Sequence, residues 1–215
     1  MINRTGFALL ALGALLFAAL LYAAMTYQIL GWPSDTDAQG PWLQIALYTI
    51  VFGLPYALYE LVRGGSILKV VLLVLLIPAV HYGAILLFIW WTAEGQALVP
   101  AIDEMGQEIA GPAISPAVIA GLLSGFAGAL VSFGLVAILG LRAATAGLVV
   151  FLAGLLLLTA WGGVGLWLLG DQPEPKDLVL KLYLPWQLIF AFFLSAMLRP
   201  SPARGTVATT EAPAD

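Results

Sequence analysis

A single histidine, His81, lies near the middle of a long apolar segment of this 215-residue chain. Pro78 precedes it by about one helical turn, where a proline frees the backbone carbonyl of Val74 from its helical partner. In a membrane such a group has to find its partner inside the protein. His81, Tyr82 and the bend at Pro78 could therefore form a polar centre for proton transfer or for a quinone headgroup. The alternative is a neutral histidine that only bonds to a neighbouring helix.

The preceding apolar segment contributes Tyr56 and Glu60 to the same candidate intramembrane polar site. Glu60 stands three residues before Arg63, a spacing that favours a local ion pair on a helix surface. The alternative is a carboxylate at the inner mouth of a pathway through the membrane.

A second candidate site is an aromatic pocket open to the outer side, formed by Trp161, Trp186 and Lys181. Lys181 lies close in sequence to Tyr183 and Gln187, so this stretch could bind a substrate. The alternative is simpler. Tryptophans anchor helices at the membrane interface, and the long stem of a lysine lets its ammonium group reach water.

Small side chains form one continuous stripe along the segment 116–140. They recur three and four residues apart, as neighbours on one helical face do: Ala117, Ala120, Gly121, Ser124, Gly125, Gly128, Ala129 and Ser132. Such faces let helix backbones approach closely, so we expect a helix-packing face centred on Gly121, Ser124, Gly125, Gly128 and Ser132. Packing within the chain is one interpretation. A surface for a second subunit or for a flat ligand is the other.

Several kinds of chemistry find little support in these residues. The chain has no cysteine, which excludes disulfides, thiolate metal sites and cysteine nucleophiles. One histidine cannot supply two axial haem ligands and makes a protein-only metal cage improbable. Ser124 lacks a convincing catalytic arrangement, and paired intramembrane carboxylates are missing. We therefore expect no catalytic or metal-ligating residues, no evident cofactor other than a quinone or another lipophilic ligand, and, on balance, no enzyme.

The elements that must position these residues are membrane helices. Hydrophobic residues make up 62% of the chain and charged residues 9%, and the mean hydropathy is +1.02. A water-soluble fold could not bury so much apolar surface. A spanning helix needs about 20 apolar residues, and six stretches qualify: 7–27, 42–62, 67–91, 116–140, 144–168 and 178–198. The sequence predicts an all-α, polytopic membrane bundle over residues 1–198 and a disordered cytoplasmic tail over 199–215.

Basic residues predict the orientation of this bundle. If six helices alternate, one side carries Arg4, Arg63, Lys69, Arg142, Arg199 and Arg204. The other side carries only Lys176 and Lys181, together with most of the acidic residues. Cytoplasmic loops are enriched in Lys and Arg, so both termini are predicted to be cytoplasmic. We expect a multi-pass protein of the cell inner (plasma) membrane, of bacterial origin.

Two functions remain open at this point. The small-residue stripe and the scarcity of buried polar groups favour a non-catalytic accessory or assembly subunit, packed against other membrane subunits or a second copy of itself. The alternative is a small-solute or ion permease or channel with a polar centre near His81. The lipid bilayer is the expected partner in both cases, and the absence of a basic surface argues against nucleic acid.

Overall fold

The computed structural model describes residues 3–27, 47–64, 66–94, 116–138, 147–169 and 174–198. They form the helices α1 (Arg4–Tyr27), α3 (Ile50–Val62), α4 (Ile67–Glu94), α5 (Pro116–Ile138), α6 (Leu148–Leu169), α7 (Pro175–Asp177), the π-helix η2 (Leu178–Tyr183) and α8 (Leu184–Met197). The helical class is thus confirmed for the described residues. The predicted tail at 199–215 lies outside them.

Four helical stretches are long and apolar enough to cross a membrane: Arg4–Tyr27, Pro116–Leu135, Leu148–Leu169 and Leu178–Met197. α3 and the Val74–Phe88 part of α4 are apolar but shorter. The four long stretches are apolar over most of their circumference, with large side chains such as Leu15, Leu130 and Leu156 exposed on the outside. A helix that is apolar all round suits lipid on one side and protein on the other. The structure therefore supports a membrane protein.

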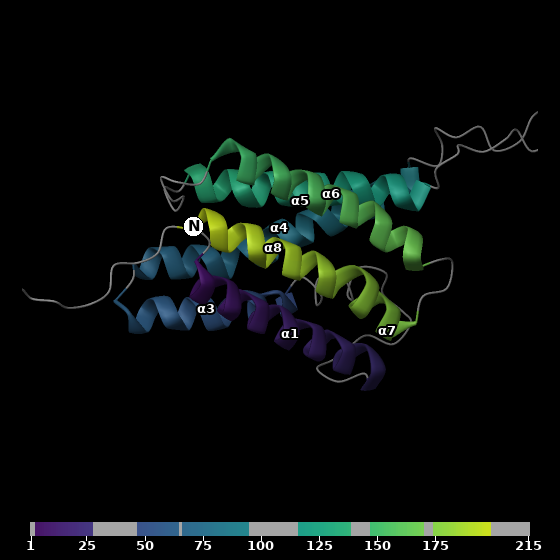
Figure 1. Cartoon of the computed structure of the whole chain (residues 1–215). Helices are drawn as coiled ribbons and strands as arrows, with labels where there is room; N and C mark the ends of the chain where they lie inside the picture. Colours follow the sequence, from purple (N-terminus) through teal and green to yellow (C-terminus); the bar gives the residue numbers. More distant parts are fainter. Residues whose placement is uncertain are drawn as a thin grey trace, which may run out of the picture.

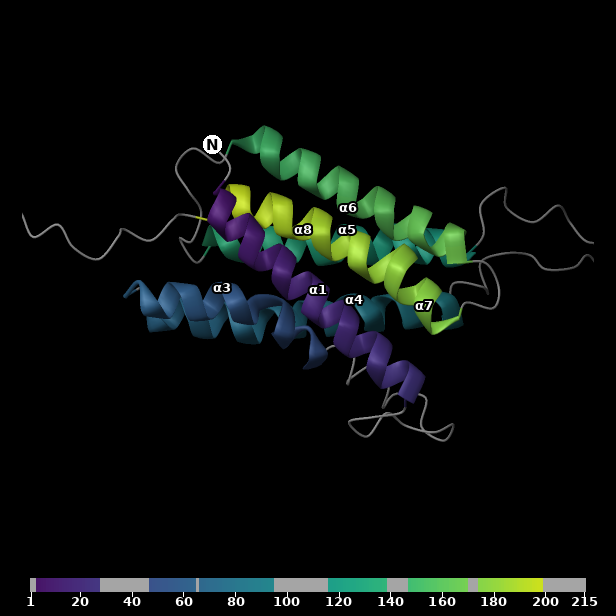
Figure 2. The same cartoon turned by 60° about the horizontal axis from the view of Figure 1, so that its bottom comes forward.

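The six longer helices run side by side in one bundle (Figure 1), and the contacts between them close into a ring. Four contacts join helices that follow each other in the chain: α1 with α3, α3 with α4, α4 with α5, and α5 with α6. α8 then packs against α6 on one side and against α1 on the other, which closes the ring. Consecutive helices alternate in direction (Figure 2). The first turn of α1 consequently meets the last turns of α8, where the rings of Phe7 and Phe192 lie 5.8 Å apart. The N-terminus of α1 and the C-terminus of α8 share one end of the bundle.

Two local backbone features shape the ring. Gly64 connects α3 to α4 with a φ of 78°, in the left-handed region that glycine adopts without strain. Its amide donates to the carbonyl oxygen of Leu61, which closes the turn. At the opposite end, η2 widens the helical path before α8 begins. Pro55 and Pro78 lie inside α3 and α4, as the sequence indicates.

Aromatic side chains fill much of the centre of the ring. Phe190 of α8 is 3% exposed and contacts three other rings. Its centroid lies 5.7 Å from Phe52 of α3, 5.7 Å from Phe133 of α5 and 5.3 Å from Trp186 of its own helix. Stacking geometry of this kind stabilises packing beyond the area that is buried. Phe190 thereby links opposite sides of the ring.

Candidate functional site

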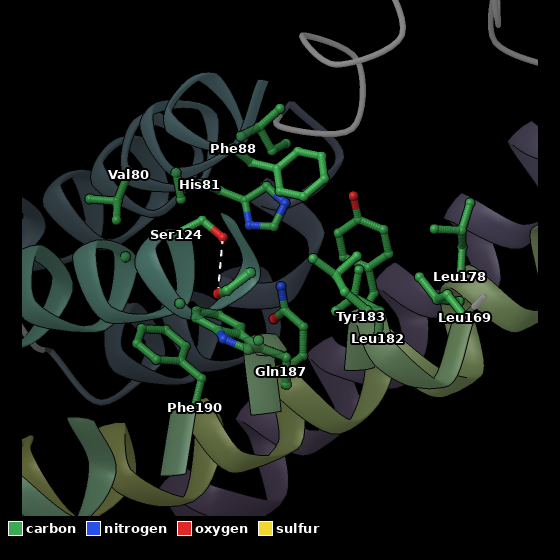
Figure 3. Close-up of a pocket in the computed structure, with 18 of the residues that line it drawn as sticks. Val80, His81, Phe88, Ser124, Leu169, Leu178, Leu182, Tyr183, Gln187 and Phe190 are labelled. Carbon is green, nitrogen blue, oxygen red and sulfur yellow. Dashed lines mark hydrogen bonds between the residues drawn. The ribbon is translucent and has the colours of Figure 1, made fainter. Parts of the chain in front are cut away.

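A cavity of about 390 Å³ lies between α4, α5, α6 and the η2–α8 helix (Figure 3). Neither α1 nor α3 contributes to its lining. The residues that line it are Val80, His81, Ala84, Ile85, Phe88, Ala117, Gly121, Ser124, Gly125, Gly128, Ser132, Gly162, Leu166, Leu169, Leu178, Leu182, Tyr183, Trp186, Gln187 and Phe190. Its size lies in the range of small-molecule sites, which are mostly apolar with a few placed polar groups.

The small residues of α5 have two roles in this arrangement. Gly121 and Gly125 are buried against α6, where a Cβ atom on Gly125 would lie 2.8 Å from the carbonyl oxygen of Leu158. Gly128 is less crowded, since a Cβ atom there would meet Ala84 at 3.5 Å and Trp186 at 3.8 Å. The stripe packs against α6 and also forms one wall of the cavity. Because Gly128 has no side chain, the cavity extends between α4 and α8 at this level.

Two buried polar atoms at this site have no hydrogen-bond partner. They are Nε2 of His81 and Oε1 of Gln187. Gln187 is 2% exposed, and its amide is turned toward the His81 ring across the cavity (Figure 3). Nearby, the hydroxyl of Ser124 donates to the carbonyl oxygen of Gly121 at 3.2 Å. Buried polar atoms are paired in the great majority of native sites, so two unpaired atoms that face one space point to a missing partner.

Aromatic contacts fix the orientation of His81. Its ring centroid lies 5.8 Å from that of Tyr183 and 6.3 Å from that of Phe17. Phe17 and Tyr183 are themselves 6.1 Å apart, so the three rings form a triangle that joins α1, α4 and η2. The imidazole is held by packing on one side and borders the cavity on the other.

The π-helix contributes to the same site. η2 supplies Leu178, Leu182 and Tyr183 to the lining, and α8 follows directly with Trp186 and Gln187. A π-helix is rare and often lies at a functional site. The sequence drew attention to Tyr183 and Gln187 only as neighbours of Lys181. Their position opposite His81 depends on the closure of the ring.

The structure does not gather the rest of the predicted polar site around the cavity. Tyr56, Tyr82 and Glu60 are absent from its lining. Tyr56 and Glu60 are each 1% exposed on α3. The guanidinium of Arg63 donates to the hydroxyl of Tyr59 and lies 5.2 Å from the centre of its ring.

The three residues of the predicted outer aromatic pocket do not line the cavity together. Trp186 lines the cavity, whereas neither Trp161 nor Lys181 does. The indole nitrogen of Trp161 is buried without a hydrogen-bond partner. Lys181 Nζ lies 3.1 Å from Asp177 Oδ1 and donates to the carbonyl oxygen of Leu168 at 3.5 Å. That lysine connects η2 to the end of α6.

No group of three or more potential metal ligands occurs among the residues that the structure describes. The arrangement suits reversible binding of an apolar molecule with a polar head, held by hydrogen bonds and ring contacts. Comparison with protein-family models, curated proteins and solved structures finds no match for this chain.

Proposed function

We propose that this chain is a multi-pass membrane protein that binds a small lipophilic molecule inside its helix bundle. The cavity of about 390 Å³ carries this proposal, because two buried polar atoms without partners, on His81 and Gln187, border an otherwise mainly apolar space. A buried polar atom that lacks a hydrogen bond costs about 1–3 kcal/mol. A ligand that supplies hydrogen bonds to both atoms would remove that cost.

We further propose that the bundle crosses the inner membrane six times with both termini in the cytoplasm. The alternating helices support this topology, since Arg4 and Arg63 lie at the end shared by the two termini of the described bundle (Figure 2). At the opposite end, Lys176 is 2.7 Å from Glu174 and Lys181 is 3.1 Å from Asp177. Both lysines that oppose the positive-inside rule are therefore paired with carboxylates.

A permease is the second candidate function. The cavity lining extends from Phe190, near the centre of the ring, to Leu169 and Leu178, where α6 ends and η2 begins. A solute bound beside His81 would thus lie on a path toward one end of the bundle. An accessory subunit stays a further proposal, but its main sequence argument is weaker, because Gly121 and Gly125 pack against α6 of the same chain.

Titration calorimetry of the purified protein in detergent with p-pentylphenol tests this proposal. Wild type should bind it saturably, with about one molecule per chain. Gly128→Leu places a large side chain between Ala84 and Trp186 and should weaken binding by about tenfold or more.

Gly134→Leu is the matched control, because it makes the same change on α5 at a position where a Cβ atom meets nothing within 4 Å. This variant should bind like wild type. The proposal is wrong if the phenol does not bind to wild type, or if Gly128→Leu and Gly134→Leu bind it equally well.

A further inference from the structure

We propose that the cavity selects a lipophilic ligand whose head carries a hydrogen-bond donor, with a hydroxyl group on a planar ring as the class that fits best. This inference rests on the proposed function and specifies its ligand. Among quinone-related molecules, a hydroquinone ring belongs to this class. A fully oxidised quinone, whose ring oxygens only accept hydrogen bonds, does not.

Gln187 provides the first argument. Its Oε1 is buried and unpaired, and the residue is 2% exposed. An amide oxygen can only accept hydrogen bonds. A ligand with only carbonyl or ether oxygens would bring another acceptor to this position and leave Oε1 desolvated. A hydroxyl or N–H group on the ligand would satisfy it.

His81 provides the second argument. A charged imidazole is costly at bilayer depth, and a neutral imidazole has one nitrogen that donates and one that accepts. Nε2 of His81 is the atom without a partner. A hydroxyl both donates and accepts, so one hydroxyl can donate to Oε1 of Gln187 and accept from Nε2 of His81 in the tautomer that carries the proton there. The two side chains face each other across the cavity (Figure 3), as a shared partner between them requires.

The walls around these two groups indicate the shape of the ligand. Gly125 and Gly128 of α5 present little more than backbone on one side, and Trp186 presents its ring near Gly128. A planar head can lie against such a wall without displacing side chains. Toward the far end the lining is apolar, with Leu169 and Leu178. The head should therefore lie beside His81 and Gln187, and an apolar tail should extend toward those leucines.

A pair of probes tests this inference. p-Pentylphenol and p-pentylanisole have nearly the same shape, but the methyl ether lacks the donor. We expect wild type to bind the phenol about tenfold more tightly, the size of effect that one unsatisfied buried polar atom produces. A third probe, trans-4-pentylcyclohexanol, tests the planar ring. Its hydroxyl can also donate to Gln187, but its ring is not planar. Tighter binding of the phenol than of this alcohol supports the planar ring, and the reverse order contradicts it.

Gln187→Leu supplies the matched variant. It removes the acceptor while keeping a side chain of similar size, so the phenol should lose its advantage over the ether, to within about twofold. Binding of the ether should stay near its wild-type value, which shows that the variant folds; Gln187→Met is the second choice if the leucine variant does not. Equal binding of phenol and ether to wild type overturns the donor inference and leaves the proposed function intact. Failure of both probes to bind overturns the two together.

Discussion

Gly121 of α5 and Gly162 of α6 meet backbone to backbone, so that a Cβ atom on either residue would collide with the carbonyl oxygen of the other. This contact fixes how closely the two helices approach. Helices in a membrane gain little from hydrophobicity alone and associate through close packing of small residues. The same two glycines line the cavity, so the closest helix contact in this wall also sets the cavity's shape.

We predict that Gly121→Ala and Gly162→Ala each lower the free energy of unfolding by about 1–3 kcal/mol, because a methyl group overpacks the crossing. Gly83→Ala and Gly134→Ala are the controls, since a Cβ atom at either position meets nothing within 4 Å. There alanine should be neutral or stabilising by up to about 1 kcal/mol, through helix propensity. Thermal unfolding in detergent measures all four. Equal shifts for the two pairs would contradict this packing.

His81→Phe should keep the fold and weaken ligand binding. A phenyl ring can still pack against Phe17 and Tyr183, and replacing an unpaired polar atom by an apolar one costs little, so stability should change by less than about 1 kcal/mol. Affinity for p-pentylphenol should fall about tenfold. His81→Ala should lose stability as well, by about 2–5 kcal/mol. Unchanged phenol affinity in the phenylalanine variant would remove His81 from the binding site.

The absence of cysteine makes the topology directly testable, because single cysteines can be introduced without background labelling. Arg4→Cys and Lys176→Cys place a thiol at exposed positions on opposite ends of the bundle. In intact cells a membrane-impermeant maleimide should label position 176, and it should label position 4 only after lysis. Labelling of both positions in intact cells, or of position 4 alone, would exclude the proposed orientation.

Lys181→Met should cost less than about 1 kcal/mol, because the ion pair with Asp177 is partly exposed and surface pairs contribute little. The loss should shrink at high salt, which screens the pair. Lys176→Met is the comparison, since its more exposed pair with Glu174 should give no measurable change. The thermal midpoints of wild type and both variants, measured at low and high sodium chloride, test this prediction. A loss of several kcal/mol for Lys181 would point to a role beyond this local pairing.

Apolar run length could predict an all-helical chain with several helices long and apolar enough to cross a membrane, because length and hydrophobicity largely determine a membrane helix. The stripe on α5 could likewise be read from spacing alone, since it depends on the helical period. The sequence could not show which helix faces the stripe. The contact of Gly121 with Gly162 depends on the order of helices around the ring.

The grouping of polar residues was harder to predict, because it depends on contacts distant in sequence. His81 and Gln187 are 106 positions apart and face one cavity only because α8 returns between α6 and α1. Tyr56 and Glu60 are near His81 in sequence but lie outside the cavity lining. The π-helix was also missed, because its hydrogen-bond pattern depends on packing more than on residue type.

The π-helix changes the angular position of the side chains in the helix that follows it, α8. A π-turn closes its hydrogen bond one residue later than an α-turn, and one residue corresponds to about 100° of rotation. The side chains after Tyr183 therefore have a different angular register from the one an unbroken α-helix would give them. Converting η2 to a regular α-helix with the same number of residues would rotate Gln187 by about 100° and turn it away from His81. Deleting one residue from the segment at the same time would return Gln187 to its place. The number of residues in this segment, as well as their chemistry, thus determines which side chains reach the cavity.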